Sequence, residues 1–357
     1  QLYLATVADS ELDTVDPAAL AATAAVHLEL GAFRGPGESQ LRVFTPESWD
    51  ARGSTVVLMV SDDRPFLVDT SIMALTRQGW SHRGIYHPQP TTLRGPDGRL
   101  AGFGGSGTPE SWIVLEVYPP LGHPAAELSG ALADELRSAL ETVEIVVADW
   151  QPMQDKMRAV ADELGTRRMP LPDEGKREAQ EFLRWAANDH FTFLGYREYT
   201  VRKQGKDEVL VADEDSGMGL LRGKDSGAPR LLKSLAAHGM PQSGAVDALI
   251  LTKTNARATV HRPGYMDYIG VLGFDAKGKP VSEQRFLGLY TSSAYNRRPW
   301  DIPVVRQRHE YVMQQSGLDP NSHSGKALRH ILETLPREEL FQSSEEELFR
   351  TGMGILG

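Results

Sequence analysis

The segment from Asp62 to Asp69 carries the residue types best suited to hold a small ligand. It reads Asp62-Asp63-Arg64-Pro65-Phe66-Leu67-Val68-Asp69 and joins an apolar run of strand length to a stretch with helical spacing. Backbone amides at the start of a helix favour a carboxylate. Asp62 or Asp63 can hold an ammonium group, and Arg64 can hold a second carboxylate. Together with Pro65, Phe66 and Leu67, these residues form a candidate ligand site.

The same segment also has a purely structural interpretation. One aspartate would cap the following helix, and Arg64 would be a surface charge. Phe66, Leu67 and Val68 would then pack in the core. The residues alone leave both interpretations open.

Three further patterns lack either the spacing or the neighbouring secondary structure that their chemistry needs. Gly102–Gly107 matches G-x-G-x-x-G, but Thr108–Glu110 and a strand follow it instead of a helix, so we expect a flexible loop. Ser324–Lys326 lacks the first glycine of a phosphate-binding loop, because a proline lies five residues before Gly325. His82 and His87 are five residues apart beside one strand and would point to opposite faces. We expect no metal, no resident cofactor and no catalytic residue in this chain.

The composition excludes several classes of protein. The chain has 357 residues, room for two or three domains, and its 40% apolar and 24% charged residues are ordinary for a globular protein. It has no cysteine, which excludes disulfides and fits a reducing, cytoplasmic compartment. A net charge of −10 disfavours nucleic acid as a partner. No run approaches the roughly 20 apolar residues of a membrane-spanning helix.

The first half of the chain predicts a domain that positions the Asp62–Leu67 segment. Region 1–53 is expected to be helical and extended, with a helix from about Asp16 to Leu30. Region 54–150 shows the order strand, helix, strand, strand, helix, strand, which is the split βαβ pattern of ferredoxin-like domains. The expected strands are Thr55–Val60, Trp80–His87, Ile113–Val117 and Val143–Val147, and the expected helices cover Leu67–Leu75 and Leu128–Leu140.

A second α+β domain is expected over 174–299, after a linking helix within 151–173. It begins with an amphipathic helix and continues with strands joined by short turns, which favours an antiparallel sheet. The stretch Gly223–Gly244 is less regular and is expected to be a mobile loop. The expected strands are Phe191–Val201, Val209–Val211, Ala248–Thr252, Ala256–His261, Ile269–Phe274 and Phe286–Tyr290, with a turn at Asp275–Gly278.

Region 300–357 is expected to be helical. Apolar residues recur at helical spacing over Val304–Val312 and Ala327–Leu332. The chain begins with a glutamine and ends just after two apolar residues, so we expect it to be part of a longer polypeptide. Two pairs of residues are candidates for a helix capping box: Ser343 with Glu346, or Ser344 with Glu347.

Three stretches carry a family resemblance that spans most of the chain. They are Asp62–Thr70 with Gly79 and His87-Pro88, then Phe191–Arg197, then Phe286–Thr291 through Tyr295 and Pro303 to Asp319–His323. Together they resemble the N-terminal region of the large, long-chain bacterial NAD-specific glutamate dehydrogenases. In that family the first domain resembles the ACT domains that sense amino acids, and the second resembles an ACT- or PAS-type fold.

The resemblance implies a regulatory and assembly role. The parent enzyme would deaminate L-glutamate oxidatively to 2-oxoglutarate with NAD, in a catalytic domain far downstream. The partners would be that downstream region, further copies in a homo-oligomer, and an amino acid as effector. One departure concerns the ligand loop, where ACT domains often carry glycine after the proline. Phe66 stands there, and its ring would either block the site or serve only packing.

Two rival functions stay open at this point. The chain is a pure oligomerisation scaffold if its α+β domains bind nothing small and use their sheet edges only for contacts with neighbouring subunits. It is a free-standing enzyme of another type if His261, Asp267 and Glu283 cluster in one water-excluded cleft.

Overall fold

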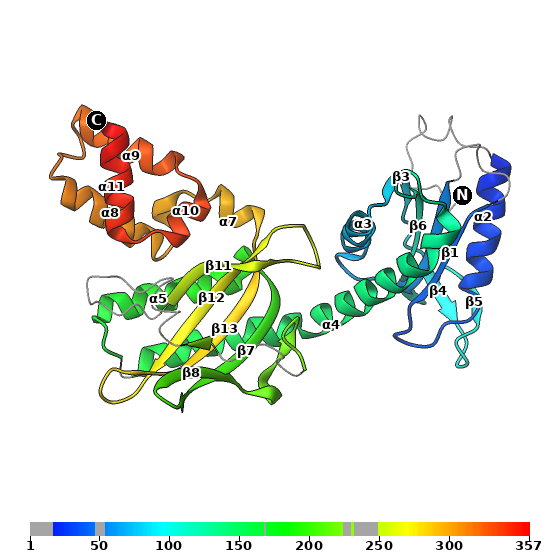
Figure 1. Cartoon of the computed structure of the whole chain (residues 1–357), viewed down its shortest axis with the longest axis horizontal. Coiled ribbons are helices and arrows are strands. Elements are labelled where there is room, and N and C mark those ends of the chain that lie inside the picture. The colour runs from blue at the N-terminus through cyan, green and yellow to red at the C-terminus, as the bar shows by residue number, and fades with distance from the viewer. Residues whose placement is uncertain (1–16, 47–53, 168, 224–229, 232–248) are drawn as a thin grey trace. The chain divides into compact units, whose positions relative to one another are not determined.

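The computed structural model describes residues 17–46, 54–167, 169–223, 230–231 and 249–357. The chain divides into two compact units (Figure 1). The first unit is Gln1–Val147 with Thr259–Pro263, and the second is Ala148–Ala258 with Gly264–Gly357. The loop expected at Gly223–Gly244 and the helix cap expected at Asp16 lie almost wholly outside the described residues.

The first unit is built on an antiparallel sheet of six strands with helices on both faces. Val26 and Leu30 of one helix pack against Val56 and Leu58 on one face. On the other face Ser71 Oγ lies 3.7 Å from Met59 Sδ, so the next helix covers that face. The strand order is β1-β2-β6-β4-β5, with β3 also on β6. The elements are α2 (Pro17–Leu30), β1 (Gln40–Phe44), β2 (Thr55–Asp62), α3 (Leu67–Arg77), β3 (Ser81–Tyr86), β4 (Thr91–Arg94), β5 (Leu100–Phe103), β6 (Thr108–Tyr118) and α4 (Ala125–Thr166).

The fourth strand expected at Val143–Val147 is wrong, because these residues belong to α4. Val143 and Val146 are buried while Ile145 is 37% exposed, which is the spacing of a helix and not of a strand. A short apolar run cannot be assigned by periodicity alone. The additional strand of this sheet is instead β1, which pairs antiparallel with β2 from Gln40 opposite Val60 to Phe44 opposite Val56.

The glycine-rich stretch Gly102–Gly107 covers the end of β5 and the short turn into β6, so part of the expected flexible loop is strand. Leu100–Phe103 forms β5, pairs with β4, and is joined by a short turn to β6. Gly107 packs against backbone there, since a Cβ at this position would meet the Thr92 carbonyl oxygen at 2.2 Å. A strand follows the glycines, as the sequence indicated.

The second unit is a seven-stranded antiparallel sheet with helices, and it confirms the expected sheet type. Its strand order is β10-β8-β7-β13-β12-β11, with β9 beside β7. The turn at Asp275–Gly278 joins β12 to β13 as expected, and Gly278 has φ 78°. The elements are α5 (Asp173–Trp185), η2 (Ala186–His190), β7 (Phe191–Gln204), β8 (Asp207–Ala212), η3 (Glu214–Ser216), β9 (Met218–Gly219), β10 (Arg230–Leu231), β11 (Leu249–Arg257), β12 (Tyr265–Phe274) and β13 (Pro280–Tyr290).

The strand expected at Ala256–His261 is mostly wrong. β11 ends at Arg257, and the Ala258 amide donates to the Gly264 carbonyl at 2.8 Å to close a loop. His261 lies in that loop with φ 78°, a left-handed conformation that does not continue a strand.

The C-terminal helices share one core with the second sheet. Phe341 stacks on Tyr290 of β13 at 4.2 Å between ring centroids, and Leu328, Leu332 and Leu348 belong to the same buried cluster. The capping box of the last helix is the one formed by Ser344 and Glu347. The helices are α7 (Ser292–Asn296), η4 (Pro299–Asp301), α8 (Val305–Ser316), α9 (His323–Thr334), α10 (Arg337–Gln342) and α11 (Glu345–Leu356).

Candidate functional site

The Asp62–Leu67 segment lies where β2 turns into α3. Asp62 ends the strand and Leu67 begins the helix, with 2% of its surface exposed. Phe66 precedes the helix with φ 73°, and among the described residues no side chain caps the helix there. The expected aspartate cap is therefore wrong, whereas the core position of Leu67 is confirmed.

A buried ion-pair network holds the end of β2. Arg34 Nη2 lies 2.7 Å from Asp62 Oδ1 and 2.6 Å from Glu110 Oε1. Arg94 Nε lies 2.6 Å from the same Glu110 oxygen, and Trp112 Nε1 donates to the other at 3.1 Å. Glu110 is fully buried, and only 4% of Arg34 is exposed. Asp62 is thus already paired within the first unit.

The balance of burial and pairing sets the charge of Glu110. Burial raises the pKa of Glu110, but hydrogen bonds from Arg94 and Arg34 outweigh it, so the pKa lies below its ordinary value. The carboxylate therefore stays ionised at neutral pH. Sequence reasoning missed Arg34, Arg94 and Glu110, because no local pattern marks three residues that only the sheet brings together.

Asp63 also has partners within the first unit. Ser111 Oγ donates to Asp63 Oδ1 at 2.6 Å, and Gln89 Nε2 donates to the same oxygen at 2.8 Å. Ser111 gives its only hydrogen to Asp63, so His87 Nε2, 2.9 Å from Ser111 Oγ, is the donor in that contact. Burial lowers the pKa of His87, and the charge of Asp63 offsets this only in part.

Arg64 connects the segment to helix α4. Its Nη2 lies 3.1 Å from Asp62 Oδ2 and 3.3 Å from Glu144 Oε1. Only 17% of the Arg64 side chain is exposed, whereas 42% of the Glu144 side chain is. The guanidinium group expected to take a ligand carboxylate is therefore occupied by carboxylates of the protein.

The ring of Phe66 packs inside the first unit. It lies against the His261 ring, with 4.7 Å between centroids, and the His261 amide donates to Thr70 Oγ1 at 3.3 Å. Of the two roles that the sequence left open for this ring, the structure thus shows a packing contact.

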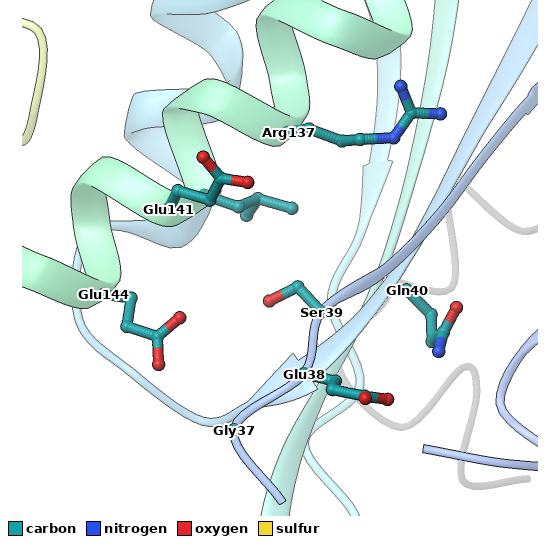
Figure 2. Close-up of a pocket in the computed structure, with 8 residues that line it drawn as sticks. Gly37, Glu38, Ser39, Gln40, Arg137, Glu141 and Glu144 are labelled. Carbon is teal, nitrogen blue, oxygen red and sulfur yellow. The ribbon is translucent and has the colours of Figure 1, made fainter. Parts of the chain in front are cut away.

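A cavity of about 460 Å³ lies next to this network (Figure 2). One wall is the chain leading into β1, and the other is a face of α4 that includes Glu144, the partner of Arg64. Figure 2 shows the Ser39 side chain directed towards the space between the walls. The lining residues are Gly37, Glu38, Ser39, Gln40, Arg137, Leu140, Glu141 and Glu144.

The triad considered for a free-standing enzyme does not assemble. In the β12–β13 register, Asp267 pairs with Gly288 and Glu283 with Leu272. Leu272 lies five positions after Asp267 along β12, an odd spacing, so Asp267 and Glu283 point to opposite faces of the sheet. His261 belongs to the first unit. Within the described residues no group of three His, Cys, Asp or Glu side chains is placed to hold a metal ion.

None of the described helices is both long enough and apolar enough to cross a membrane.

Comparisons with known proteins identify both ends of the chain. The model of the glutamate dehydrogenase ACT1 domain matches residues 1–136, and the model of glutamate dehydrogenase helical motif 1 matches residues 302–357. Among solved structures, an RNA-binding light-oxygen-voltage receptor is similar at 11% identity with a TM-score of 0.15, over 83% of this chain and 90% of that chain. A TM-score this low supports no argument.

Three curated relatives are NAD-specific glutamate dehydrogenases. The one from Pseudomonas aeruginosa is 34% identical over 329 residues, which cover 89% of this chain and 20% of the relative. The one from Halomonas elongata is 33% identical over 335 residues, covering 90% and 20%, and the one from Mycobacterium tuberculosis is 27% identical over 341 residues, covering 92% and 19%. This chain spans about a fifth of their length. It belongs to the NAD-specific glutamate dehydrogenase family, of which it carries the N-terminal region with the ACT1 domain.

Proposed function

We propose that this chain is the regulatory and assembly region of an NAD-specific glutamate dehydrogenase. The parent reaction converts L-glutamate, NAD and water to 2-oxoglutarate, ammonium and NADH, in a part of the polypeptide downstream of this region. The matches to the relatives and to the ACT1 model support this role. The glycine-rich run supports it too, because it lies at the end of β5 and in the turn into β6, and not at a helix N-terminus where a pyrophosphate would bind.

The observation that carries the regulatory part is the contact between Arg64 and Glu144. It joins the loop between β2 and α3 to a charged cavity on α4. A ligand that takes Glu144 as a partner changes the balance of charges around Arg64 and Asp62. Such a ligand regulates the enzyme only if its affinity differs between two states of the protein. An amino acid is the effector that the ACT1 match favours.

A test uses the full-length enzyme and its initial rate with glutamate and NAD in the presence of each common amino acid. We expect at least one amino acid to change the rate. We expect Arg64→Ala to reduce that change while the rate without effector stays close to wild type. A rate that no amino acid alters, in an enzyme of normal assembly, would contradict the regulatory role.

A scaffold without a ligand is the second candidate, and one observation favours it. Asp62, Asp63 and Arg64 all have partners within the protein, so the loop needs no ligand to balance its charges. Calorimetric titration of the full-length enzyme separates the two. Heat with an amino acid that disappears in the Asp63→Ala, Arg64→Ala double variant favours sensing, and no heat with any amino acid favours the scaffold.

A further inference from the structure

The loop between β11 and β12 is grouped with a different unit from the strands that carry it. Both strands belong to the second unit, whereas Thr259–Pro263 belongs to the first. The Ala258 amide donates to the Gly264 carbonyl at 2.8 Å and closes the base of the loop. Val260 is fully buried. This loop is therefore a packed part of the first unit that the chain ties directly to the second sheet.

The contacts of the loop fall on the Asp62–Leu67 segment and on the first turn of α3. The His261 ring lies against the Phe66 ring, with 4.7 Å between centroids. The His261 amide donates to Thr70 Oγ1 at 3.3 Å, and Thr70 is only 1% exposed. The Thr70 amide in turn donates to the Phe66 carbonyl at 2.9 Å. The loop therefore holds both ends of this helical turn.

The ring contact joins two residues with unusual backbones. Phe66 has φ 73° and His261 has φ 78°, which is the left-handed region. Residues with a Cβ atom rarely adopt this conformation, so the surrounding contacts must hold it there. Breaking the ring contact lets both backbones relax. The pair therefore favours a change between two distinct arrangements over a gradual deformation.

The base of the same hairpin is held by the C-terminal helices. Lys253 of β11 pairs with Asp267 of β12 in the strand register, and its Nζ lies 2.8 Å from Asp267 Oδ1. The same Nζ lies 3.1 Å from Glu338 Oε1 on α10. Asp267 is buried, and its Oδ2 accepts a hydrogen bond from the Tyr290 amide at 2.9 Å. The hairpin thus has its tip on the Asp62–Leu67 segment and its base on α10.

We propose that the β11–β12 hairpin transmits a change in the Asp62–Leu67 segment to the C-terminal helices. When Phe66 and the first turn of α3 rearrange, the contacts with His261 are lost and the hairpin moves. Lys253 then changes its contact with Glu338 on α10. The part of this mechanism in amino-acid regulation rests on the proposed function, because it needs an effector that distinguishes the two arrangements. The coupling between the segment and α10 does not.

Hydrogen exchange of the full-length enzyme, followed by mass spectrometry, tests the coupling. Phe66→Gly removes the ring and adopts φ 73° without strain, and Thr70→Val removes the acceptor at nearly constant size. We expect each to speed exchange over 258–264 about five- to tenfold, the value of one hydrogen bond, and to speed exchange in α10 as well. The matched control is Thr76→Val, which removes an exposed hydroxyl from the same helix, and we expect no change.

Two results of this experiment would overturn the coupling. One is wild-type exchange over 258–264 in both Phe66→Gly and Thr70→Val. The other is faster exchange that stays within 258–264 and does not reach α10. Peptides of β2 serve as the internal reference, because their wild-type exchange shows that the first unit of each variant remains folded.

A second measurement separates transmission from ligand binding. His261→Gly lies outside the Asp62–Leu67 segment, so we expect an amino acid that alters the wild-type rate to bind this variant with unchanged heat. We expect its effect on the rate to fall at least fivefold. A wild-type response in His261→Gly would sink the coupling and leave the proposed function standing. If no amino acid alters the wild-type rate, the proposed function falls, and the exchange experiment still decides the coupling.

Discussion

At the scale of single residues, Glu110 is the position on which the candidate site depends most. It is fully buried and pairs with both Arg34 and Arg94. Glu110→Gln removes the charge, leaves the Arg94 guanidinium without its carboxylate partner, and leaves Arg34 with Asp62 alone. We expect the free energy of unfolding of the first unit to fall by about 3–5 kcal/mol, as when one partner of a buried ion pair is removed.

Urea denaturation measures the effect of Glu110→Gln. Glu141→Gln is the control, because it changes the same charge at an exposed position that has no ion pair or hydrogen bond with any described side chain, and we expect a difference within about 0.5 kcal/mol. Equal midpoints for the two variants would show that the buried network contributes nothing to stability.

His27 makes the stability of the first unit depend on pH. Burial lowers its pKa from 6.5 to about 4, and the hydrogen bond with the Met59 carbonyl offsets this only in part. Above pH 6.5 the imidazole is neutral in both the folded and the unfolded state, so its titration takes nothing from the free energy of unfolding. As the pH falls from 6.5 to about 4, the unfolded state binds the proton first, and we expect a loss of about 3 kcal/mol.

The check is urea denaturation of wild type and His27→Gln at pH 7 and at pH 4.5. Because carboxylates also titrate in this window, only the difference between the two proteins reports His27. We expect the wild type to lose more stability on acidification than the variant does. The same loss in both would assign the acid sensitivity to other groups.

At the residue scale, the sequence predicted the position of the Asp62–Leu67 loop but not the residues that form ion pairs with it. Asp62, Asp63 and Arg64 lie at the end of β2 as expected, since the strand and helix patterns on either side are local. Their contacts are not local. Arg34 and Glu144 come from 28 and 80 residues away from Asp62 and Arg64 respectively, so only the folded sheet and α4 bring them together. The cavity, lined by residues 37–40 and 137–144, was unforeseen for the same reason.

At the scale of elements, α4 supplies the sharpest contrast between strand and helix. A strand over Val143–Val147 would bury residues 143, 145 and 147 together, whereas the helix buries Val143 and Val146 and leaves Ile145 37% exposed. We expect Ile145→Lys to change the free energy of unfolding by less than about 1 kcal/mol. We expect Val146→Lys to cost more than about 3 kcal/mol, because it buries an unpaired charge.

Chemical denaturation of both variants tests this element. A larger loss of stability for Ile145→Lys than for Val146→Lys would support a strand at Val143–Val147 instead of the helix.

The error in the sequence prediction has a physical cause, since Val143-Glu144-Ile145-Val146-Val147 is rich in β-branched residues that favour strands. Tertiary burial of one helical face overrode that preference. The hairpin turn at Asp275–Gly278 and the capping box at Ser344 were predictable because their chemistry is contained in four neighbouring residues.

At the scale of the whole molecule, the order of regions along the chain does not reveal which ones share a core. The sequence treats 174–299 and 300–357 as separate regions, yet one buried cluster runs from Phe182 and Phe193 to Leu332 and Phe341. The second sheet and the C-terminal helices therefore form one compact unit, distinct from the first. Periodicity marks which face of a helix is apolar, but not which distant element covers it.

This shared core predicts that the second unit unfolds as one cooperative body. Phe341 is 2% exposed and stacks on Tyr290 at 4.2 Å, so Phe341→Ala should cost about 3–5 kcal/mol. Native-state hydrogen exchange followed by mass spectrometry locates the loss. Amides of β12 and β13 should lose protection together with those of α8, α9 and α11, because they open in the same global event. Amides of β2 and β6 in the first unit should keep their wild-type protection. Loss confined to the helices would mean that the sheet has a core of its own and that the helices dock on it without sharing its stability.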